Sequence, residues 1–342
     1  MQLKFYPYDL KFDEVFAVSA NARTGTEIIY IELYSDGQVG YGEASFPPYM
    51  KEKRTDNLDF LAGLNLESFN SIDAFVEIQN YINAFPNYLP AKAALDMALL
   101  DLKGKTSNQN VRSFFANEPL KSIPTSFTIG IGEDAFLIRQ LKKAEAFPII
   151  KIKLNGDINY VKHAITLIKS TTQKPLGVDF NQGIANSKVA LELLDWLHGQ
   201  GVQYAEQPLP ETLIADFAWL KENSLLPIFG DESIQTIEDI ESKHHLFDGV
   251  NIKLMKCGGL TDAYQMVKLA RHYNLQLMLG CMAESVCAIT AAANLANLFD
   301  KVDLDGHLMM TNDLFTGVTL ENGHLLLSTA PGMGVEKKLS AL

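Results

Sequence analysis

The segment from Ile149 to Asn181, IIKIKLNGDINYVKHAITLIKSTTQKPLGVDFN, decides the fold, because it holds two short apolar runs separated by a helical stretch. The runs IIKIKLN and PLGVDFN have the length and apolar content of strands buried inside a sheet. A strand, a helix and a second strand form the unit from which parallel sheets are built. The segment therefore predicts one repeat of an α/β fold.

The same unit recurs along the chain after Ser122. Successive apolar runs are 25, 26, 26, 25, 23, 26 and 25 residues apart, with centres near Phe127, Ile152, Val178, Tyr204, Phe229, Ile252, Met278 and Asp303. Eight units at so even a spacing favour a (β/α)8 barrel. A doubly wound open sheet is the alternative.

The first part of the chain does not show the repeated strand–helix pattern. Alternation around Ser-Asp-Gly predicts a β-hairpin over Thr26–Phe46. Helical spacing of apolar residues predicts a helix over Leu89–Lys105, with Gly104 at its end. We expect three parts: an α+β domain at 1–118, a barrel at 119–315, and a turn-rich C-terminal segment at 316–342 that returns to the N-terminal part.

Composition excludes several classes of partner. The 342 residues are 47% hydrophobic and 20% charged, as in globular proteins, and the net charge of −12 argues against nucleic acid or an anionic membrane. The three cysteines, Cys257, Cys281 and Cys287, lack metal-finger spacing and fit reduced, buried thiols. The N-terminus lacks the apolar core of a signal peptide, so we expect a cytoplasmic protein. A homo-oligomer stays open.

Charged and polar residues recur where the predicted strands end, which is the functional face of such barrels. They are Lys151, Lys153, Asp179, Asn181, Glu206, Asp231, Glu232, Lys253, Asp303 and Asp305. A single charge at a strand end is usually solvated or paired. A whole ring of charges on successive strands is unusual and indicates a site.

Three of these acids, Asp179, Glu206 and Asp231, come from three successive strands. Buried together they would repel one another unless a cation compensates them. A set of oxygen ligands without His or Cys suits Mg²⁺. The sequence therefore predicts a magnesium site at these three residues.

The lysines lie on either side of this predicted site. Lys153 and Lys253 come from strands two and six, which are opposite each other in an eight-strand barrel. Lys151 is two residues from Lys153 and points to the same face of its strand, so its charge is expected to lower the pKa of Lys153 and make it a better base. The alternative is that both lysines pair with acids on adjacent strands.

The KIK motif, the triad Asp179, Glu206 and Asp231, and Lys253 in NIKLMKCGGL together resemble the enolase superfamily and, within it, the muconate-lactonizing-enzyme subgroup. The resemblance covers nearly the whole chain. It implies an α+β capping domain over a (β/α)7β barrel. It also implies that Mg²⁺ binds a substrate carboxylate and stabilises an enediolate.

The resemblance further implies a set of roles. One lysine removes an α-proton and the other returns a proton to the opposite face, while Lys151, Asn181 and Glu232 support the site. The same pair of lysines also serves syn elimination and cycloisomerisation, so the subgroup alone does not fix the reaction.

Two acids on the eighth predicted strand narrow the set of reactions that the chain is expected to catalyse. Asp303 and Asp305 in VDLDGHLMM share a face, and a doubled carboxylate suits a cationic ligand group. The motif resembles that of dipeptide epimerases, in which it receives the α-ammonium. An acidic rim at the barrel mouth is the alternative.

Loops are expected to select the substrate side chain. Arg23, in a first loop before the hairpin, resembles the arginine that meets a glutamate side chain in L-Ala-D/L-Glu epimerases. A second loop, SFPPYMKEKRTD, is expected to close as a lid, with Lys51, Lys53 and Arg54 as other carboxylate partners. Further candidates for substrate binding are Thr128, Cys281 and Glu284.

The sequence thus predicts a Mg²⁺-dependent dipeptide epimerase that acts on L-Ala-D/L-Glu from peptidoglycan turnover. Alternatives in the same subgroup are an N-acylamino acid racemase and an o-succinylbenzoate synthase. An alternative of another class is a non-catalytic carboxylate-binding barrel.

Overall fold

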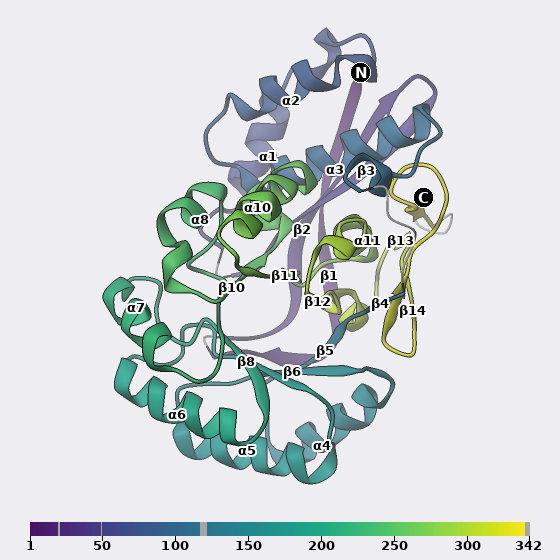
Figure 1. Cartoon of the computed structure of the whole chain (residues 1–342). Coiled ribbons are helices and arrows are strands. Elements are labelled where there is room, and N and C mark those ends of the chain that lie inside the picture. The colour runs from purple at the N-terminus through teal and green to yellow at the C-terminus, as the bar shows by residue number, and fades with distance from the viewer. Residues whose placement is uncertain (20, 49, 117–121, 339–342) are drawn as a thin grey trace.

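The computed structural model describes residues 1–19, 21–48, 50–116 and 122–338. An antiparallel sheet with helices forms the N-terminal part, and a barrel of parallel strands surrounded by helices forms the larger part below it (Figure 1). The predicted α/β barrel with an α+β capping domain is confirmed.

The N-terminal sheet has the order β1 (Gln2–Ala17), β2 (Ala22–Ser35), β3 (Gln38–Phe46). Asp36 and Gly37 join β2 to β3 with φ of 54° and 74°. Two positive φ angles are the geometry that a two-residue hairpin requires. The hairpin predicted around Ser-Asp-Gly is therefore confirmed.

One long helix covers this sheet. α3 (Leu89–Thr106) is buried along most of its length, and it continues two residues past Gly104, where we predicted its end. A Cβ at Gly40 or Gly42 would lie about 2 Å from a carbonyl oxygen of α3, so the helix can approach β3 only because these residues are glycines. The remaining α-helices of this part are α1 (Arg54–Gly63) and α2 (Phe75–Asn83).

Within the described residues the barrel has eight parallel strands in chain order. They are β5 (Ser126–Ile129), β6 (Ile149–Lys153), β7 (Leu176–Asp179), β8 (Val202–Glu206), β9 (Ile228–Gly230), β10 (Gly249–Ile252), β11 (Gln276–Gly280) and β12 (Lys301–Asp303). All eight predicted strand centres fall inside these bounds.

Helices connect the strands, and most of them are amphipathic and bury an apolar face against the barrel. They are α4 (Asp134–Lys143), α5 (Ile158–Thr171), α6 (Ser187–Gly199), α7 (Ile214–Asn223), α8 (Ile237–Lys243), α9 (Leu254–Cys257), α10 (Leu260–His272) and α11 (Val286–Ala293). After β12 comes the short 3₁₀ helix η7 (Gly306–Met309) in place of a further α-helix.

The shorter 3₁₀ turns elsewhere are η1 (Leu66–Ser68), η2 (Ile72–Ala74), η3 (Val111–Phe114), η4 (Ala144–Ala146), η5 (His244–Leu246) and η6 (Ala296–Leu298).

The C-terminal segment contacts both parts of the molecule. β14 (Thr319–Glu321) pairs with β15 (His324–Leu326), which pairs with β4 (Ile123–Pro124), and β13 (Phe315–Thr316) pairs with β16 (Glu336–Lys337). Farther along, Met333 N donates to Asp101 of α3 (2.8 Å) and Lys337 pairs with Glu32 (2.7 Å). The predicted boundary at 118/119 lies outside the described residues, and the three-part division stays a prediction.

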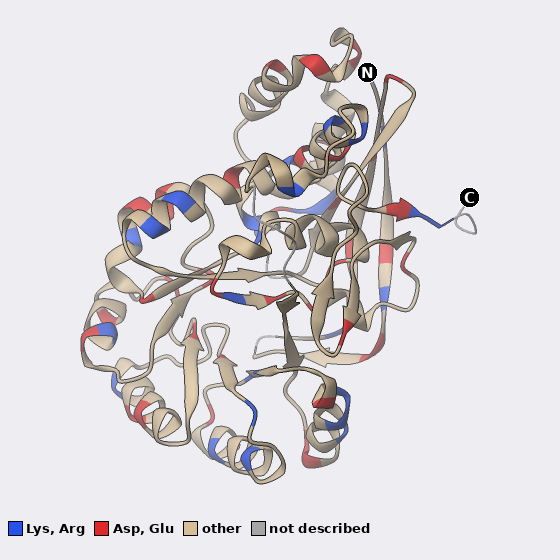
Figure 2. Cartoon of the chain, turned by 45° about the vertical axis from the view of Figure 1, so that its right-hand side comes forward, with Lys and Arg blue, Asp and Glu red and all other residues tan. Residues whose placement is uncertain are grey.

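The ends of β1 and β2 lie across the mouth of the barrel. Ala17 O accepts a hydrogen bond from Ile131 N, and Ser19 Oγ donates to Asn181 O at 3.1 Å. Figure 2 shows charges of both signs on the outer helices, with further charged positions on strands inside the barrel. In the described parts of the chain, no helix is both long and apolar enough to cross a membrane.

Candidate active site

Three carboxylates meet at the ends of neighbouring strands. Asp179 and Glu206 are the last residues of β7 and β8, and Asp231 follows directly after β9. Asp179 and Glu206 are partners in the parallel ladder, so their side chains share one level of the barrel. One oxygen from each of the three residues lies within 4.8 Å of the others, and all three residues are buried.

Within this cluster, the negative charge of Glu206 is the least well compensated. Burial, and then the charge of Asp179, raise the pKa of Glu206 to about 8. Glu206 Oε2 lies 2.8 Å from Lys151 Nζ, yet it is buried and accepts no well-aligned hydrogen bond. Three carboxylates and no nitrogen or sulfur donor are the set that Mg²⁺ prefers. The residues therefore fit a magnesium ion.

Lysine ammonium groups surround the carboxylates. Lys153 Nζ lies 2.5 Å from Asp179 Oδ2, and Lys253 Nζ lies 2.7 Å from Asp231 Oδ2. β6, which carries Lys153, and β10, whose end is followed by Lys253, are four strands apart in the barrel order. Both lysines line one cavity, so they face it from opposite sides.

Lys151 is enclosed by acids. Its Nζ lies 2.7 Å from Asp303, 2.8 Å from Glu206 and 3.2 Å from Asp179. Burial lowers the pKa of Lys151, but these three carboxylates outweigh burial and raise the pKa well above its ordinary value. Lys151 therefore stays charged and holds the carboxylates in place.

Lys256 is a part of the site that sequence reasoning missed. Its buried Nζ donates to Asp231 Oδ1 (2.5 Å) and to the carbonyl oxygens of Asp231, Ile234 and Asn251. Lys253 is the N-cap of the single-turn helix α9, which turns the side chain of Lys256 back toward Asp231. The spacing of three residues in KLMK was the only signal for it.

The supporting polar residues lie beside the cluster. Asn251 Nδ2 donates to Glu206 Oε1 (2.8 Å), and Asn181 Nδ2 donates to Glu232 Oε1 (3.2 Å). Asn181 has φ of 43° and Gln207, which follows Glu206, has φ of 38°. Left-handed backbone at non-glycine residues is strained, and here it occurs two residues after Asp179 and one residue after Glu206, both candidate ligands.

The two acids of the eighth strand occupy different environments. Asp303 is the last residue of β12, and its carboxylate accepts hydrogen bonds from Lys151 Nζ (2.7 Å) and Ser126 Oγ (2.5 Å). Asp305 is the N-cap residue of η7, and its carboxylate accepts hydrogen bonds from Thr128 N (2.5 Å) and Thr128 Oγ1 (3.2 Å). Burial, and then the charge of Asp303, raise the pKa of Asp305 to about 7. Of these two acids, Asp305 is therefore the one without an ion-pair partner in the part of the chain that the structure describes.

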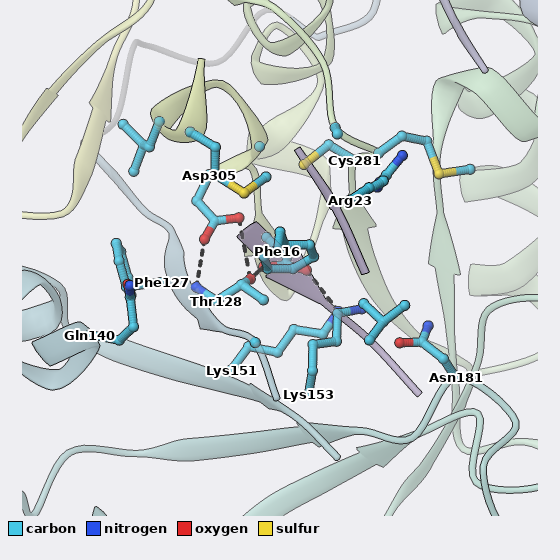
Figure 3. A pocket seen from close by; sticks show the side chains of 18 of the residues that line it. Phe16, Arg23, Phe127, Thr128, Gln140, Lys151, Lys153, Asn181, Cys281 and Asp305 are labelled. Carbon is cyan, nitrogen blue, oxygen red and sulfur yellow. Dashed lines mark hydrogen bonds and ion pairs between the residues drawn. The ribbon is translucent and has the colours of Figure 1, made fainter. Parts of the chain in front are cut away.

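The cavity at this site has a volume of about 180 Å³, more than ten times the space that one buried water needs. Figure 3 shows Thr128 bonded to Asp305 in the middle of it, with Phe127 and Gln140 on one side and Arg23, Cys281 and Asn181 on the other. The predicted residues Lys151, Lys153, Lys253, Asp303 and Glu232 also line it.

Other predicted site residues differ in their placement. Arg23 lies in strand β2 and not in a loop, although it does line the cavity, with its guanidinium 5.5 Å from the Phe12 ring. Glu284 is buried behind the cavity, where it accepts a hydrogen bond from Met282 N, and burial raises its pKa to about 7. Burial also raises the pKa of the Cys281 thiol.

The described residues of the predicted lid do not line the cavity. Arg54 pairs with Asp9 and Glu27, and Lys51 pairs with Glu211, so these cations already have acidic partners. Lys53 is not among the described residues that line the cavity. Tyr49 lies outside the described residues.

Two family models match the chain. The model described as "Enolase C-terminal domain-like" matches residues 134–341, and the model described as "Mandelate racemase / muconate lactonizing enzyme, N-terminal domain" matches residues 11–115.

The chain is similar over nearly its whole length to characterised proteins. It is 40% identical to an L-Ala-D/L-Glu epimerase of Bacteroides thetaiotaomicron over 98% of this chain and 88% of that protein. It is 35% identical to an L-Ala-D/L-amino acid epimerase of Pedosphaera parvula over 97% of each chain. Among solved structures, a dipeptide epimerase of Enterococcus faecalis complexed with Mg and L-Leu-L-Tyr superposes with a TM-score of 0.88, at 27% identity over 98% of each chain.

Proposed function

The chain belongs to the mandelate racemase / muconate lactonizing enzyme family of the enolase superfamily and is an epimerase, and from this premise we propose that it is a Mg²⁺-dependent dipeptide epimerase. We propose L-Ala-D/L-Glu, released during peptidoglycan turnover, as a substrate. The observation that carries the proposal is the placement of Lys153 and Lys253, which face one cavity from opposite sides.

A proton-transfer reaction at one carbon needs a base on each face of that carbon. In the proposed reaction, Lys153 Nζ removes the α-proton of the second residue from one face, and Lys253 Nζ delivers a proton to the other. Asp179, Glu206 and Asp231 would hold the Mg²⁺. The bound Mg²⁺ would offset the negative charge that develops on the substrate carboxylate.

The remaining residues position the dipeptide. Asp305 is half-buried in the cavity wall and has no ion-pair partner among the described residues, and the substrate α-ammonium would supply that positive charge. Arg23 would pair with the side-chain carboxylate of the second residue. A substrate without an ammonium group would leave the Asp305 carboxylate uncompensated, which favours a dipeptide over an N-acyl or succinylbenzoate substrate.

The test is proton exchange in D₂O with Mg²⁺ and L-Ala-L-Glu, followed by NMR of the glutamate α-proton. We expect loss of that signal together with formation of L-Ala-D-Glu, and no reaction after removal of divalent cations with EDTA. Lys153→Ala and Lys253→Ala should each abolish epimerisation, while each retains exchange from one epimer. Full epimerisation by either variant would contradict the two-base mechanism.

A further inference from the structure

The cavity extends past Asp305 toward helix α4, away from the lysines that perform the proposed proton transfer. Phe136, Gln140 and Lys143 line this outer end and recur at the spacing that places them on one face of α4. Phe127 comes from β5, and Leu308 and Met309 come from η7. We call Phe127, Phe136, Leu308 and Met309 the outer wall.

The position of Asp305 relates the outer wall to a bound dipeptide. In the proposed function, on which this inference rests, Asp305 binds the α-ammonium, and the side chain of the first residue leaves from the carbon that bears this group. Figure 3 shows Phe127 and Gln140 on the side of Asp305 opposite to Arg23. If Arg23 meets the second side chain, the first side chain points toward the outer wall.

The polar groups at this end bind one another. Glu14 accepts hydrogen bonds from Gln140 Nε2 (2.9 Å) and Arg139 Nη2 (2.8 Å) and pairs with Lys143 (2.5 Å). The hydrogen bonds from Lys143 and Arg139 lower the pKa of Glu14 to about 2. Its charge is therefore already neutralised, and it offers little to a cationic side chain.

Apolar surface remains uncovered here. Leu308 is 39% exposed and Val15, at the rim of the same cavity, is 53% exposed. An apolar side chain of a ligand would cover this surface and would leave the Glu14 cluster intact.

We propose that the outer wall is a subsite for an uncharged apolar side chain larger than alanine at the first position of the dipeptide. The preferred substrates are then L-Xaa-L-Glu dipeptides in which Xaa is leucine or a residue like it, and L-Ala-L-Glu is accepted but does not fill the subsite.

The experiment measures kcat/KM of the Mg²⁺-loaded protein for L-Ala-L-Glu, L-Leu-L-Glu and L-Lys-L-Glu. Burial of the additional carbons of leucine is expected to raise kcat/KM about tenfold over L-Ala-L-Glu. L-Lys-L-Glu has a side chain of similar reach and should fall below L-Leu-L-Glu, because Lys143 already pairs with both acids that line this end, Asp13 (3.3 Å) and Glu14 (2.5 Å). A Leu-to-Ala ratio below about threefold, or L-Lys-L-Glu at or above L-Leu-L-Glu, would overturn the proposal.

A matched pair of variants assigns the preference to the outer wall. Leu308→Ala should lower the Leu-to-Ala ratio about threefold or more, whereas Leu326→Ala, at a similarly exposed position on β15, should leave it unchanged. An unchanged ratio in Leu308→Ala, or an equal fall in both variants, would overturn the assignment. Equal rates for all three dipeptides refute this subsite alone, whereas no reaction with any of them refutes the proposed function as well.

Discussion

Replacement of Lys256 by methionine is the sharpest test of how the carboxylate cluster is held. Lys256 Nζ donates to Asp231 Oδ1 at 2.5 Å and to three backbone carbonyl oxygens, and it is buried. Methionine fills a similar volume but removes the charge. Among the described residues, Lys253, at 2.7 Å, is then the one ammonium partner left to the Asp231 carboxylate.

The expected losses of stability and of Mg²⁺ affinity follow from these contacts. Removal of one partner from a buried ion pair costs about 3–5 kcal/mol, because the other charge stays buried. A residue that orients a metal ligand typically contributes about 10- to 100-fold to metal affinity. Lys256→Met should therefore lower the free energy of unfolding by about 3 kcal/mol or more and weaken Mg²⁺ binding at least tenfold.

The assay combines urea unfolding with calorimetric titration of Mg²⁺ into the metal-free protein. Lys105→Met is the matched control, because Lys105 also pairs with a buried acid, Asp101 (2.7 Å), but on α3, away from the site. Both variants should lose stability, and only Lys256→Met should lose Mg²⁺ affinity. Mg²⁺ affinity within about twofold of the wild type in Lys256→Met, or an equal loss in Lys105→Met, would refute a positioning role.

Three further predictions concern pH dependence and substrate binding. Burial raises the pKa of Glu43 to about 8, so the folded state keeps a proton that the unfolded chain releases above its ordinary pKa near 4.5. This contribution to stability is complete below about pH 4.5 and is lost as the pH rises through 8. Glu43→Gln should therefore flatten the pH dependence of the free energy of unfolding, measured with urea, between pH 5 and 8. An unchanged pH dependence would contradict this assignment. Asp305→Asn should raise KM for L-Ala-L-Glu about 100-fold and should affect an N-acylated substrate much less; parallel effects on both would argue against ammonium binding. Arg23→Ala should reduce kcat/KM for L-Ala-L-Glu about 100-fold and for L-Ala-L-Leu only slightly, whereas equal losses would mean that Arg23 does not select the side chain.

The barrel could be predicted because its strands are short, apolar and evenly spaced, and these are properties of local sequence. The eight predicted centres lie inside β5 to β12. The ends of parallel strands lie at one level, which is why Asp179, Glu206 and Asp231 could be placed together before any coordinates were considered.

The rest of the site depends on contacts that spacing does not encode. Asp303 and Asp305 were expected on one face, but β12 ends at Asp303, and the chain then turns into η7. Arg23 was expected in a loop, because the sequence of β1 is mixed in polarity and does not show the alternation typical of a strand. Without a predicted β1, no strand was expected to pair with the residues around Arg23. Glu14 and Gln140 are 126 residues apart, and only the docking of β1 over α4 brings them together.

The seam between the first and last barrel strands has a consequence for the order in which the protein becomes active. Thr125 Oγ1 accepts a hydrogen bond from Leu304 N (2.9 Å), and Thr128 N donates to Asp305 (2.5 Å), so side chains close the barrel at this point. During synthesis the N-terminal residues emerge first, and Asp303 and Asp305 emerge only after β5 to β11. A nascent chain that already carries both lysines and all three carboxylates therefore still lacks one wall of the cavity until β12 has emerged and joined β5.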